Sequence, residues 1–400
     1  MVLLPTSESS TASSANTALN SSIKPPINAT PFHFSPDSLA QSAADGESKT
    51  KLCGTCGALG ILAKFEEPKL HKVLQCVPRW DMATLRGQAN CPLCRLLRKT
   101  LDNCTAIHLD TVDLIWGRFE GRCSPSPDTW PPRRLRLFVD VKSEQGFVTT
   151  KDINRCLQIN SKNYSQATDN NFVHARQISP DKVDASLVVK WLRQCEQMHH
   201  LCQPLTTDAL TKFRFRVIDV LSGCIIEAPP NCSFIALSYV WGGVQQRSIS
   251  RTRMEVFRYS GSLWAVKRVI STTIMDAITF CRLINQRYLW VDSLCIVSDD
   301  SDKHRQILHM DAIYACAILT IVDAAGTGAD GGLFGVRGRL RKSAQEEEEI
   351  LGLPMISAIA SMGDLLDDST WITRGWTFQE YLLSKRLLIF TQRLAFFKCR

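Results

Sequence analysis

A short apolar run that stops at paired glycines constrains the fold of this chain more than any other feature. The run begins at Phe234, reads Phe-Ile-Ala-Leu-Ser-Tyr-Val-Trp-Gly-Gly and ends at Gly243. Its length and its terminal glycines predict a buried strand over 234–240 that ends abruptly. Because glycine has no side chain, the turn after this strand can bring backbone N–H groups close to a ligand.

Strand and helix patterns alternate after that run. Further strands are predicted over 288–297, 318–323, 386–391 and 394–398, and helices over 268–285, 302–316 and 376–384. Continuous apolar runs of this kind are typical of strands that helices cover on both faces. The alternation predicts a mostly parallel α/β sheet, in which ligands bind at the edge where the parallel strands end.

Composition divides the chain into three regions. Residues 1–48 are rich in Ser, Thr, Ala, Asn and Pro, which predicts a disordered tail. Residues 49–205 form a Cys-containing mixed region, and the α/β domain is expected over 213–400. A helix over 183–198 is expected to link the two. Within the α/β domain a small hairpin is expected over 217–226.

Glycine-rich and acidic segments interrupt the α/β pattern between its later strands. Gly326–Gly338 and the acidic run Glu346–Glu349 are expected to form a long exposed excursion. The glycines at 326–332 lack the Lys-Ser/Thr of a phosphate-binding loop, so a flexible loop is expected there.

Charge and cysteine content narrow the class of protein. The net charge of +8 is spread over short clusters without interleaved aromatics, which argues against nucleic acid as the main partner. The chain has 16 cysteines, but no secretory signal is evident at its N-terminus. No apolar run reaches the length of about 20 residues that is needed to span a bilayer. We therefore expect a cytoplasmic protein with reduced thiols and no membrane span.

Three segments together resemble one family. They are the run over 234–243, Tyr288-Leu-Trp-Val-Asp-Ser-Leu-Cys-Ile296 and Arg374-Gly-Trp-Thr-Phe-Gln-Glu380. In this order they resemble the fungal heterokaryon incompatibility (HET) domain, and the resemblance spans roughly 213–400. HET domains look like distant relatives of TIR domains, so the resemblance implies a TIR-like, flavodoxin-like sheet flanked by helices.

The resemblance also implies a site. Some TIR proteins cleave the nicotinamide–ribose bond of NAD with a glutamate in a W-x-x-x-E spacing, which Trp376 and Glu380 match here. By that similarity Glu380 would be the catalytic carboxylate, which stabilises an oxocarbenium-like state. The implied NAD-binding residues are Ser238, Tyr239, Trp241, Gly242, Asp292, Arg374 and Trp376.

Structural roles are the alternative for the same residues. Arg374 and Glu380 can form a salt bridge at a helix start, with Trp376 in the core. Asp292 lies in an apolar run that is predicted to be a strand, and a buried carboxylate must find donors or a cation or become protonated. The family usually has Gln where Ser298 stands and Pro where Phe334 stands, and its members commonly continue beyond the strand predicted over 394–398. A truncated or degenerate copy is therefore a further alternative.

Two Cys-x-x-Cys pairs form a second constellation. Cys53, Cys56, Cys91 and Cys94 have the composition of a tetrahedral structural zinc site. The interval between the pairs exceeds the usual spacing of a zinc finger, and His71 and Cys76 inside it are spare ligands. Buried free thiols in a helical subdomain are the alternative.

Other polar residues carry weaker signals. His199, His200 and His304 have no partner at ligand spacing, so they are expected at the surface. Asp299, Asp300 and Asp302 can bind a cation, but a capped helix N-terminus is the favoured interpretation.

The resemblance implies an effector of heterokaryon incompatibility, allorecognition and programmed cell death in a fungus. It would act through assembly with itself or a protein partner, and through NAD cleavage if the site is active. A non-enzymatic interaction module is one alternative. A zinc-dependent nucleic-acid binder, which requires binding that weakens steeply with salt, is another.

Overall fold

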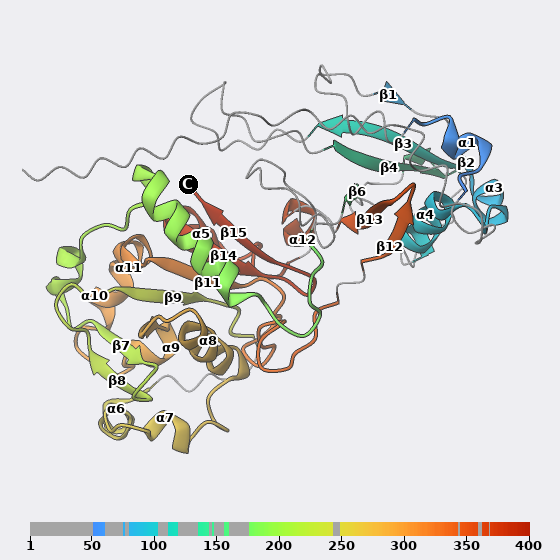
Figure 1. Ribbon diagram of the computed structural model, residues 1–400. Helices are drawn as coiled ribbons and strands as arrows, with labels where there is room; N and C mark the ends of the chain where they lie inside the picture. Colours follow the sequence, from blue (N-terminus) through green and yellow to red (C-terminus); the bar gives the residue numbers. More distant parts are fainter. Residues whose placement is uncertain are drawn as a thin grey trace, which may run out of the picture. The chain divides into compact units, whose positions relative to one another are not determined.

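The computed structural model describes two sheets and the helices around them (Figure 1). The described residues are 51–60, 75–76, 80–102, 111–118, 135–143, 146–147, 156–159, 176–242, 249–342, 345–358, 362–367 and 369–400. The expected tail over 1–48 lies outside them, as do Gly243 and His71.

The larger α/β part is built on a seven-stranded sheet in the order β15-β14-β11-β9-β10-β7-β8. Its strands are β7 (Arg216–Asp219), β8 (Cys224–Glu227), β9 (Phe234–Ser238), β10 (Tyr288–Trp290), β11 (Leu319–Asp323), β14 (Arg386–Phe390) and β15 (Ala395–Cys399). The central strands β10, β9, β11 and β14 run parallel to one another, whereas the strands at the edges pair antiparallel. The predicted mostly parallel sheet is confirmed in this coarse form.

Helices precede the seven-stranded sheet or lie between its parallel strands in sequence. They are α5 (Ala185–Met198), α6 (Arg251–Phe257), α7 (Ser262–Ala265), α8 (Thr272–Leu283), α9 (Asp292–Cys295), α10 (Lys303–Leu308), α11 (Met310–Cys316), α12 (Met362–Asp367) and α13 (Gly375–Leu383), with 3₁₀ turns η5 (His200–Cys202) and η6 (Thr207–Lys212). The chain moves from β9 to β10 in one direction and from β10 to β11 and β14 in the other. Right-handed crossovers therefore place α8 on one face and α11 with α13 on the other.

The strands that form from apolar runs are buried in the core. Every residue of β9, β11 and β14 is buried, as expected for strands that are covered on both faces. In α8 the inward face includes Ile274, Ile278 and Cys281, which share one core with β9 and β10. Here the helical spacing of the apolar residues predicted the packing face correctly.

Two predicted elements have different boundaries in the structure. The run over 288–297 is not one strand: β10 ends at Trp290, and the short helix α9 begins at Asp292. Asp292 therefore stands at a strand end rather than inside a strand. The helix expected over 302–316 is divided into α10 and α11, with His309 between them.

An eight-stranded antiparallel sheet contains the remaining strands. It follows the order β1-β3-β4-β6-β13-β12, with β2 beside β3 and β5 beside β4. Its strands are β1 (Gln75–Cys76), β2 (Trp80–Asp81), β3 (Thr111–Arg118), β4 (Leu135–Ser143), β5 (Gly146–Phe147), β6 (Cys156–Ile159), β12 (Glu347–Ile350) and β13 (Leu353–Ala358). The helices α1 (Gly54–Gly57), α3 (Met82–Gly87) and α4 (Pro92–Asp102) precede or lie between these strands in sequence.

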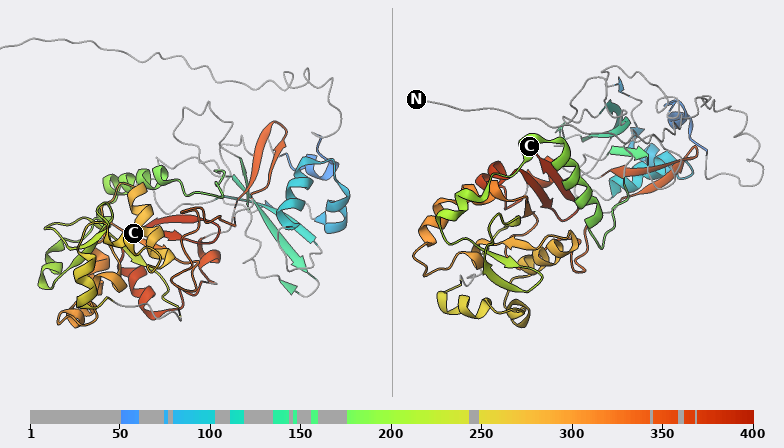
Figure 2. Two further views of the ribbon diagram at one scale, coloured as in Figure 1. Left: turned by 90° about the horizontal axis from the view of Figure 1, so that it is seen from below. Right: turned by 60° about the vertical axis from the view of Figure 1, so that its left-hand side comes forward.

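The hairpin β12–β13 changes the prediction for the acidic run only in part: Glu347 and Glu349 are exposed as expected, but the run forms a strand. β13 pairs with β6, so a segment between β11 and β14 contributes strands to the other sheet. Figure 2 shows the β12–β13 hairpin (orange) beside the helix α4 (light blue). Glu348 on β12 binds Arg95 at 3.0 Å and Lys99 at 2.9 Å, both on α4. These pairs hold the acidic side chain of Glu348, whose side chain is only 14% exposed.

The glycine-rich segment over 326–338 is also not an exposed, flexible excursion. Ala329, Leu333 and Val336 are buried in the core. Buried carboxylates fix its backbone: Asp323 accepts from the Gly326 N–H at 2.9 Å, and Asp276 accepts from the Leu333 N–H at 2.8 Å. These hydrogen bonds and the buried side chains hold the segment against the core.

No helix among the described residues is both long and apolar enough to cross a membrane.

Candidate active site

A cavity of about 400 Å³ opens at the carboxyl ends of β9 and β10. Its walls are formed by Tyr239, Trp241, Asp292, Ser293, Ile296, Ser298, Lys303, Ile307, Met310, Arg374, Trp376, Thr377 and Glu380. These residues follow β9 or β10 or lie on the helices α10, α11 and α13. The cavity therefore lies at the edge of the sheet where parallel strands end, which is where open α/β sheets bind ligands.

Glu380 lines the cavity, and a chain of hydrogen bonds between buried polar groups holds its carboxylate. The Ser238 hydroxyl donates to a carboxylate oxygen of Glu380. The indole N–H of Trp371 in turn donates to the Ser238 oxygen at 2.7 Å. Ser238 and Trp371 are buried and Glu380 is only 8% exposed. This chain fixes the Glu380 carboxylate at the end of β9, although α13 supplies it from far along the sequence.

Asp292 holds a second set of groups on the cavity wall. Its carboxylate accepts from the Trp241 indole N–H at 3.0 Å and from the Ser293 backbone N–H at 2.6 Å. The Ser293 hydroxyl lies 2.9 Å from the Tyr239 hydroxyl. The carboxylate therefore orients one of the two indoles that face the cavity.

Burial raises the pKa of both carboxyl groups. Burial is the main reason that the pKa of Glu380 rises to about 7, and the charge of Asp292 raises it further. Burial likewise raises the pKa of Asp292 to about 6, although its hydrogen bonds from Ser293 and Trp241 oppose the change. A neighbouring pair of carboxyl groups that titrate near neutral pH is typical of catalytic sites, because it can hold or release a proton there.

The cavity also combines aromatic and basic groups. Trp241 and Trp376 supply two indole rings, while Lys303 and Arg374 supply two cations. Trp376 is 57% exposed, so its ring is accessible to a ligand. Rings for stacking, cations for phosphates and carboxylates for a sugar are the groups that recognise a nucleotide.

The structure brings most of the predicted residues to this cavity. Of the predicted set, its walls include Tyr239, Trp241, Asp292, Arg374, Trp376 and Glu380. Ser238 and Gly242 are not among the described wall residues. Ser238 supports Glu380 from behind instead.

Gly242 has a packing role that the sequence did not reveal. Its φ is +73°, and a Cβ added there would lie 2.8 Å from the Cα of Gly328. The turn after β9 therefore approaches the glycine-rich segment so closely that only glycine fits.

The predicted salt bridge between Arg374 and Glu380 is absent from the ion pairs that the structure shows among its described residues. The Arg374 guanidinium donates to the Tyr239 carbonyl oxygen at 3.3 Å instead. Arg374 thus joins the start of α13 to the end of β9, while the Glu380 carboxylate accepts from the Ser238 hydroxyl.

Sequence reasoning missed Trp371, Lys303 and Ser293. Trp371 is three residues before Arg374, outside the motif that carries the resemblance, and nothing in the local sequence indicates that its indole reaches Ser238. Lys303 lies in the helix predicted over 302–316, for which the sequence indicates no binding role. Contacts between segments so distant in sequence leave no local signal.

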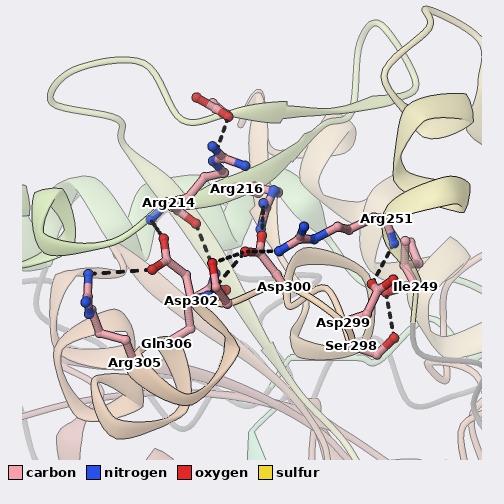
Figure 3. Close-up of polar contacts among 12 residues, drawn as sticks. Arg214, Arg216, Ile249, Arg251, Ser298, Asp299, Asp300, Asp302, Arg305 and Gln306 are labelled. Atoms are coloured by element: carbon pink, nitrogen blue, oxygen red, sulfur yellow. Dashed lines mark hydrogen bonds and ion pairs between the residues drawn. The ribbon is translucent and has the colours of Figure 1, made fainter.

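The acidic cluster over 299–302 is a network of arginine contacts (Figure 3). The buried Asp300 pairs with the buried Arg216 on β7, and Arg251 lies 3.7 Å from its other oxygen. Asp302 accepts from the Arg214 N–H at 3.2 Å and makes no side-chain cap for α10. The predicted cap is therefore confirmed in position only: Asp302 stands at the N-cap of α10, but its carboxylate makes no hydrogen bond to the N–H groups of that helix.

Electrostatics support this role of Asp300. Burial opposes its ionisation, but the hydrogen bond and charge of Arg216 hold the pKa of Asp300 below its usual value. An ionised Asp300 therefore fastens the loop after α9 to β7.

The two Cys-x-x-Cys pairs meet, as the zinc interpretation requires. The ligand atoms of Cys53, Cys56, Cys91 and Cys94 all lie within 4.8 Å of one another. The sulfur of Cys94 is 3.8 Å from that of Cys53 and 3.4 Å from that of Cys56. Since a tetrahedral zinc site separates its sulfurs by about 3.8 Å, this cluster can hold a metal ion.

The thiols of this cluster compete for protons. Hydrogen bonds with Cys91 and Cys94, together with burial, raise the pKa of Cys56 well above its usual value. The same hydrogen bond from Cys56 lowers the pKa of Cys91. A bound cation would remove this competition, because thiolates are the ligands that it needs.

One prediction about the histidines is wrong. His199 is half-buried and lies with Cys195, Cys202 and Cys399 in a second cluster of possible ligands. His200 beside it is exposed, as expected.

Comparisons with known proteins give one match. Residues 234–380 match the family model described as heterokaryon incompatibility protein (HET). No curated protein and no solved structure matched the chain. The matched segment runs from the first residue of β9 to Glu380, so it includes both carboxylates, the indoles and the cations of the cavity. The chain therefore carries a domain of the heterokaryon incompatibility (HET) family over residues 234–380.

Proposed function

We propose that this cavity hydrolyses the nicotinamide–ribose bond of NAD in the cytoplasm of a fungal cell. The reaction would serve heterokaryon incompatibility and the cell death that accompanies it. The observation that carries the proposal is the Glu380 carboxyl group, which faces a nucleotide-sized cavity with its pKa raised to about 7. Ligand cavities usually measure about 300–1,000 Å³, which includes this one.

The order of the parallel strands supports the proposal. Numbered along the chain, β10-β9-β11-β14 is the order 2-1-3-4. Flavodoxin-like sheets, to which the TIR resemblance points, begin with the same order and bind their ligand where the connections change direction. In this sheet that point lies between the carboxyl ends of β9 and β11, and the segment that follows β9 also lines the cavity.

The chemistry assigns a role to each group. Water adds to C1′ of the ribose as the C–N bond breaks, so NAD⁺ and water give ADP-ribose, neutral nicotinamide and one proton. The ionised Glu380 stabilises the positive charge that develops on the sugar. The Ser238 hydroxyl, which donates to this carboxylate, keeps it oriented.

The other groups would bind the substrate. Trp376 and Trp241 can stack on the nicotinamide and adenine rings. Lys303 and Arg374 can neutralise the pyrophosphate. Asp292 would fix the indole of Trp241 through the hydrogen bond that it already accepts.

The test is to incubate the purified, clustered full chain with NAD and measure nicotinamide release. Turnover is expected to rise as the pH is raised through about 7, because Glu380 must lose its proton to act. Glu380→Gln should abolish release. Gln379→Ala changes an exposed neighbour on α13 and should leave it intact. Equal release by wild type and Glu380→Gln would reject this site.

Self-assembly without catalysis is a second candidate function. Helix α13 exposes Phe378 by 55% and Leu382 by 47%, in addition to Trp376. An exposed apolar group of this kind can bind a second copy of the chain. Sedimentation should then show oligomers that Phe378→Ser disrupts, and toxicity in cells should survive Glu380→Gln.

We also propose that Cys53, Cys56, Cys91 and Cys94 hold a structural zinc ion. The zinc would join α1 to α4, and Glu348 would join α4 to β12. A zinc-dependent nucleic-acid binder would in addition require binding that weakens steeply as salt increases. Binding that does not change with salt would exclude that alternative.

A further inference from the structure

A second cluster of metal-type ligands lies away from the cavity, at the two ends of the α/β part. Cys195 lies in the last turn of α5, His199 ends that helix, and Cys202 ends η5. Cys399 is the last residue of β15. Residues about 200 positions apart are therefore brought together, and their ligand atoms all lie within 4.8 Å of one another.

Local structure explains the spacing. Cys195 and His199 are four residues apart, so they lie on one face of a helix. The His199 N–H donates to the Cys195 carbonyl at 3.0 Å, and the Cys202 N–H donates to the His199 carbonyl at 3.1 Å. The backbone thus folds back in two successive turns, which directs three side chains to the same place.

The distances suit a tetrahedral cation. The Cys399 sulfur lies 3.3 Å from Nδ1 of His199. Zinc binds sulfur at about 2.3 Å and nitrogen at about 2.0–2.1 Å, so a tetrahedral site separates these two ligands by about 3.6 Å. Cys195 and Cys202 are buried, while His199 and Cys399 are half-buried.

A buried arginine beside the cluster is the independent observation. Arg386 on β14 is 1% exposed, and its Nε donates to the Cys195 sulfur at 3.2 Å. Its Nη1 donates to the Ile318 carbonyl at 3.1 Å, and its Nη2 is buried without a partner. Among the described residues, no carboxylate pairs with it.

A buried charge without a counter-ion is costly. Three thiolates, one neutral imidazole and a Zn²⁺ ion carry a net charge of −1. Arg386 would then be the counter-ion of a zinc centre, with its Nε–H bonded to a ligand sulfur. Hydrogen bonds of this kind from outside groups orient ligands in metal sites.

We propose that Cys195, His199, Cys202 and Cys399 bind one zinc ion, which fastens α5 and η5 to β15. β15 pairs with β14 alone in its sheet. The zinc would give this edge strand a second attachment. The site would be structural, because all four ligand positions come from the protein and none is open to substrate.

The test begins with the zinc content of the purified full chain, measured by mass spectrometry of the metal. Cys202→Ser should lower the content by one equivalent relative to wild type. Cys232→Ser changes a buried thiol outside both clusters and should not alter it. Cys91→Ser should remove a different equivalent, so that the Cys202 and Cys91 losses add in the double variant. An unchanged zinc content in Cys202→Ser would overturn the proposal.

A second measurement does not depend on folding of a variant. In the wild-type chain, Cys195, Cys202 and Cys399 should resist alkylation and should become reactive together after a chelator is added. A mass lower by two hydrogens, with a peptide that links Cys195 to Cys202, would show a disulfide instead. Either that linkage or alkylation of these thiols in the folded chain before chelation would refute the zinc site.

Discussion

Glu380→Gln should stabilise the folded protein at alkaline pH, even though it abolishes the proposed activity. The carboxyl group has its pKa raised from 4.5 to about 7 by burial, so ionisation costs more in the folded state than in the unfolded state. The stability that this group contributes therefore falls as the pH rises from about 4.5 to about 7. Glutamine keeps an oxygen that can accept from Ser238 but has no charge to bury.

The magnitude follows from the shift. Each pKa unit corresponds to about 1.36 kcal/mol, so the full effect is about 3 kcal/mol. Most of it, about 2.5 kcal/mol, falls between pH 5 and pH 8 by the same linkage. The free energy of unfolding of Glu380→Gln, relative to wild type, should increase by roughly this amount over that interval.

Urea unfolding of both proteins at pH 5 and pH 8 measures this change, provided that each transition is two-state. Because the other buried carboxyl groups are present in both proteins, their contributions cancel to first order. Gln379→Ala should show no such pH dependence relative to wild type. If the relative stability of Glu380→Gln were the same at both pH values, the buried, high-pKa carboxyl group inferred at the cavity would be wrong.

Three further changes test the packing around the site. Asp300→Ala should lower the unfolding free energy by about 3–5 kcal/mol, because it leaves Arg216 buried without its partner. The control Asp299→Ala changes an exposed neighbour and should cost about 1 kcal/mol or less, and thermal unfolding compares the two variants. Gly242→Ala should cost at least about 1–3 kcal/mol in the same assay, because its φ is positive and its Cβ would strike another backbone segment. Trp371→Phe removes one hydrogen bond and part of a fully buried ring, so it should lower the unfolding free energy by at least about 1 kcal/mol and shift the pH profile of nicotinamide release.

The sequence predicted the order of elements in the α/β part because each has a strong periodic pattern. β9, α8 and β11 appear within a few residues of their predicted bounds. The prediction of one strand over 288–297 was wrong, because a short apolar run has the same pattern in a buried helix as in a buried strand. The turn at Val291, which ends β10 and begins α9, has no glycine or proline to mark it.

The site was predictable only in part. The motif residues Trp241, Asp292 and Glu380 lie on one cavity, as the convergence of parallel strand ends requires. The hydrogen bond from Trp371 to Ser238 and the cluster around His199 join residues that are far apart in sequence. Such contacts depend on the complete fold, so no local pattern indicates them.

The strands β12 and β13 have a consequence for how the protein can be divided. The chain leaves the parallel sheet after β11, supplies a hairpin to the antiparallel sheet and returns through α12 to α13. A fragment that starts at residue 213 would therefore lose β6, the partner of β13, and expose unpaired backbone. The same continuity makes the hairpin a covalent tether: a force applied to it pulls on the segment that positions Arg374 and Glu380.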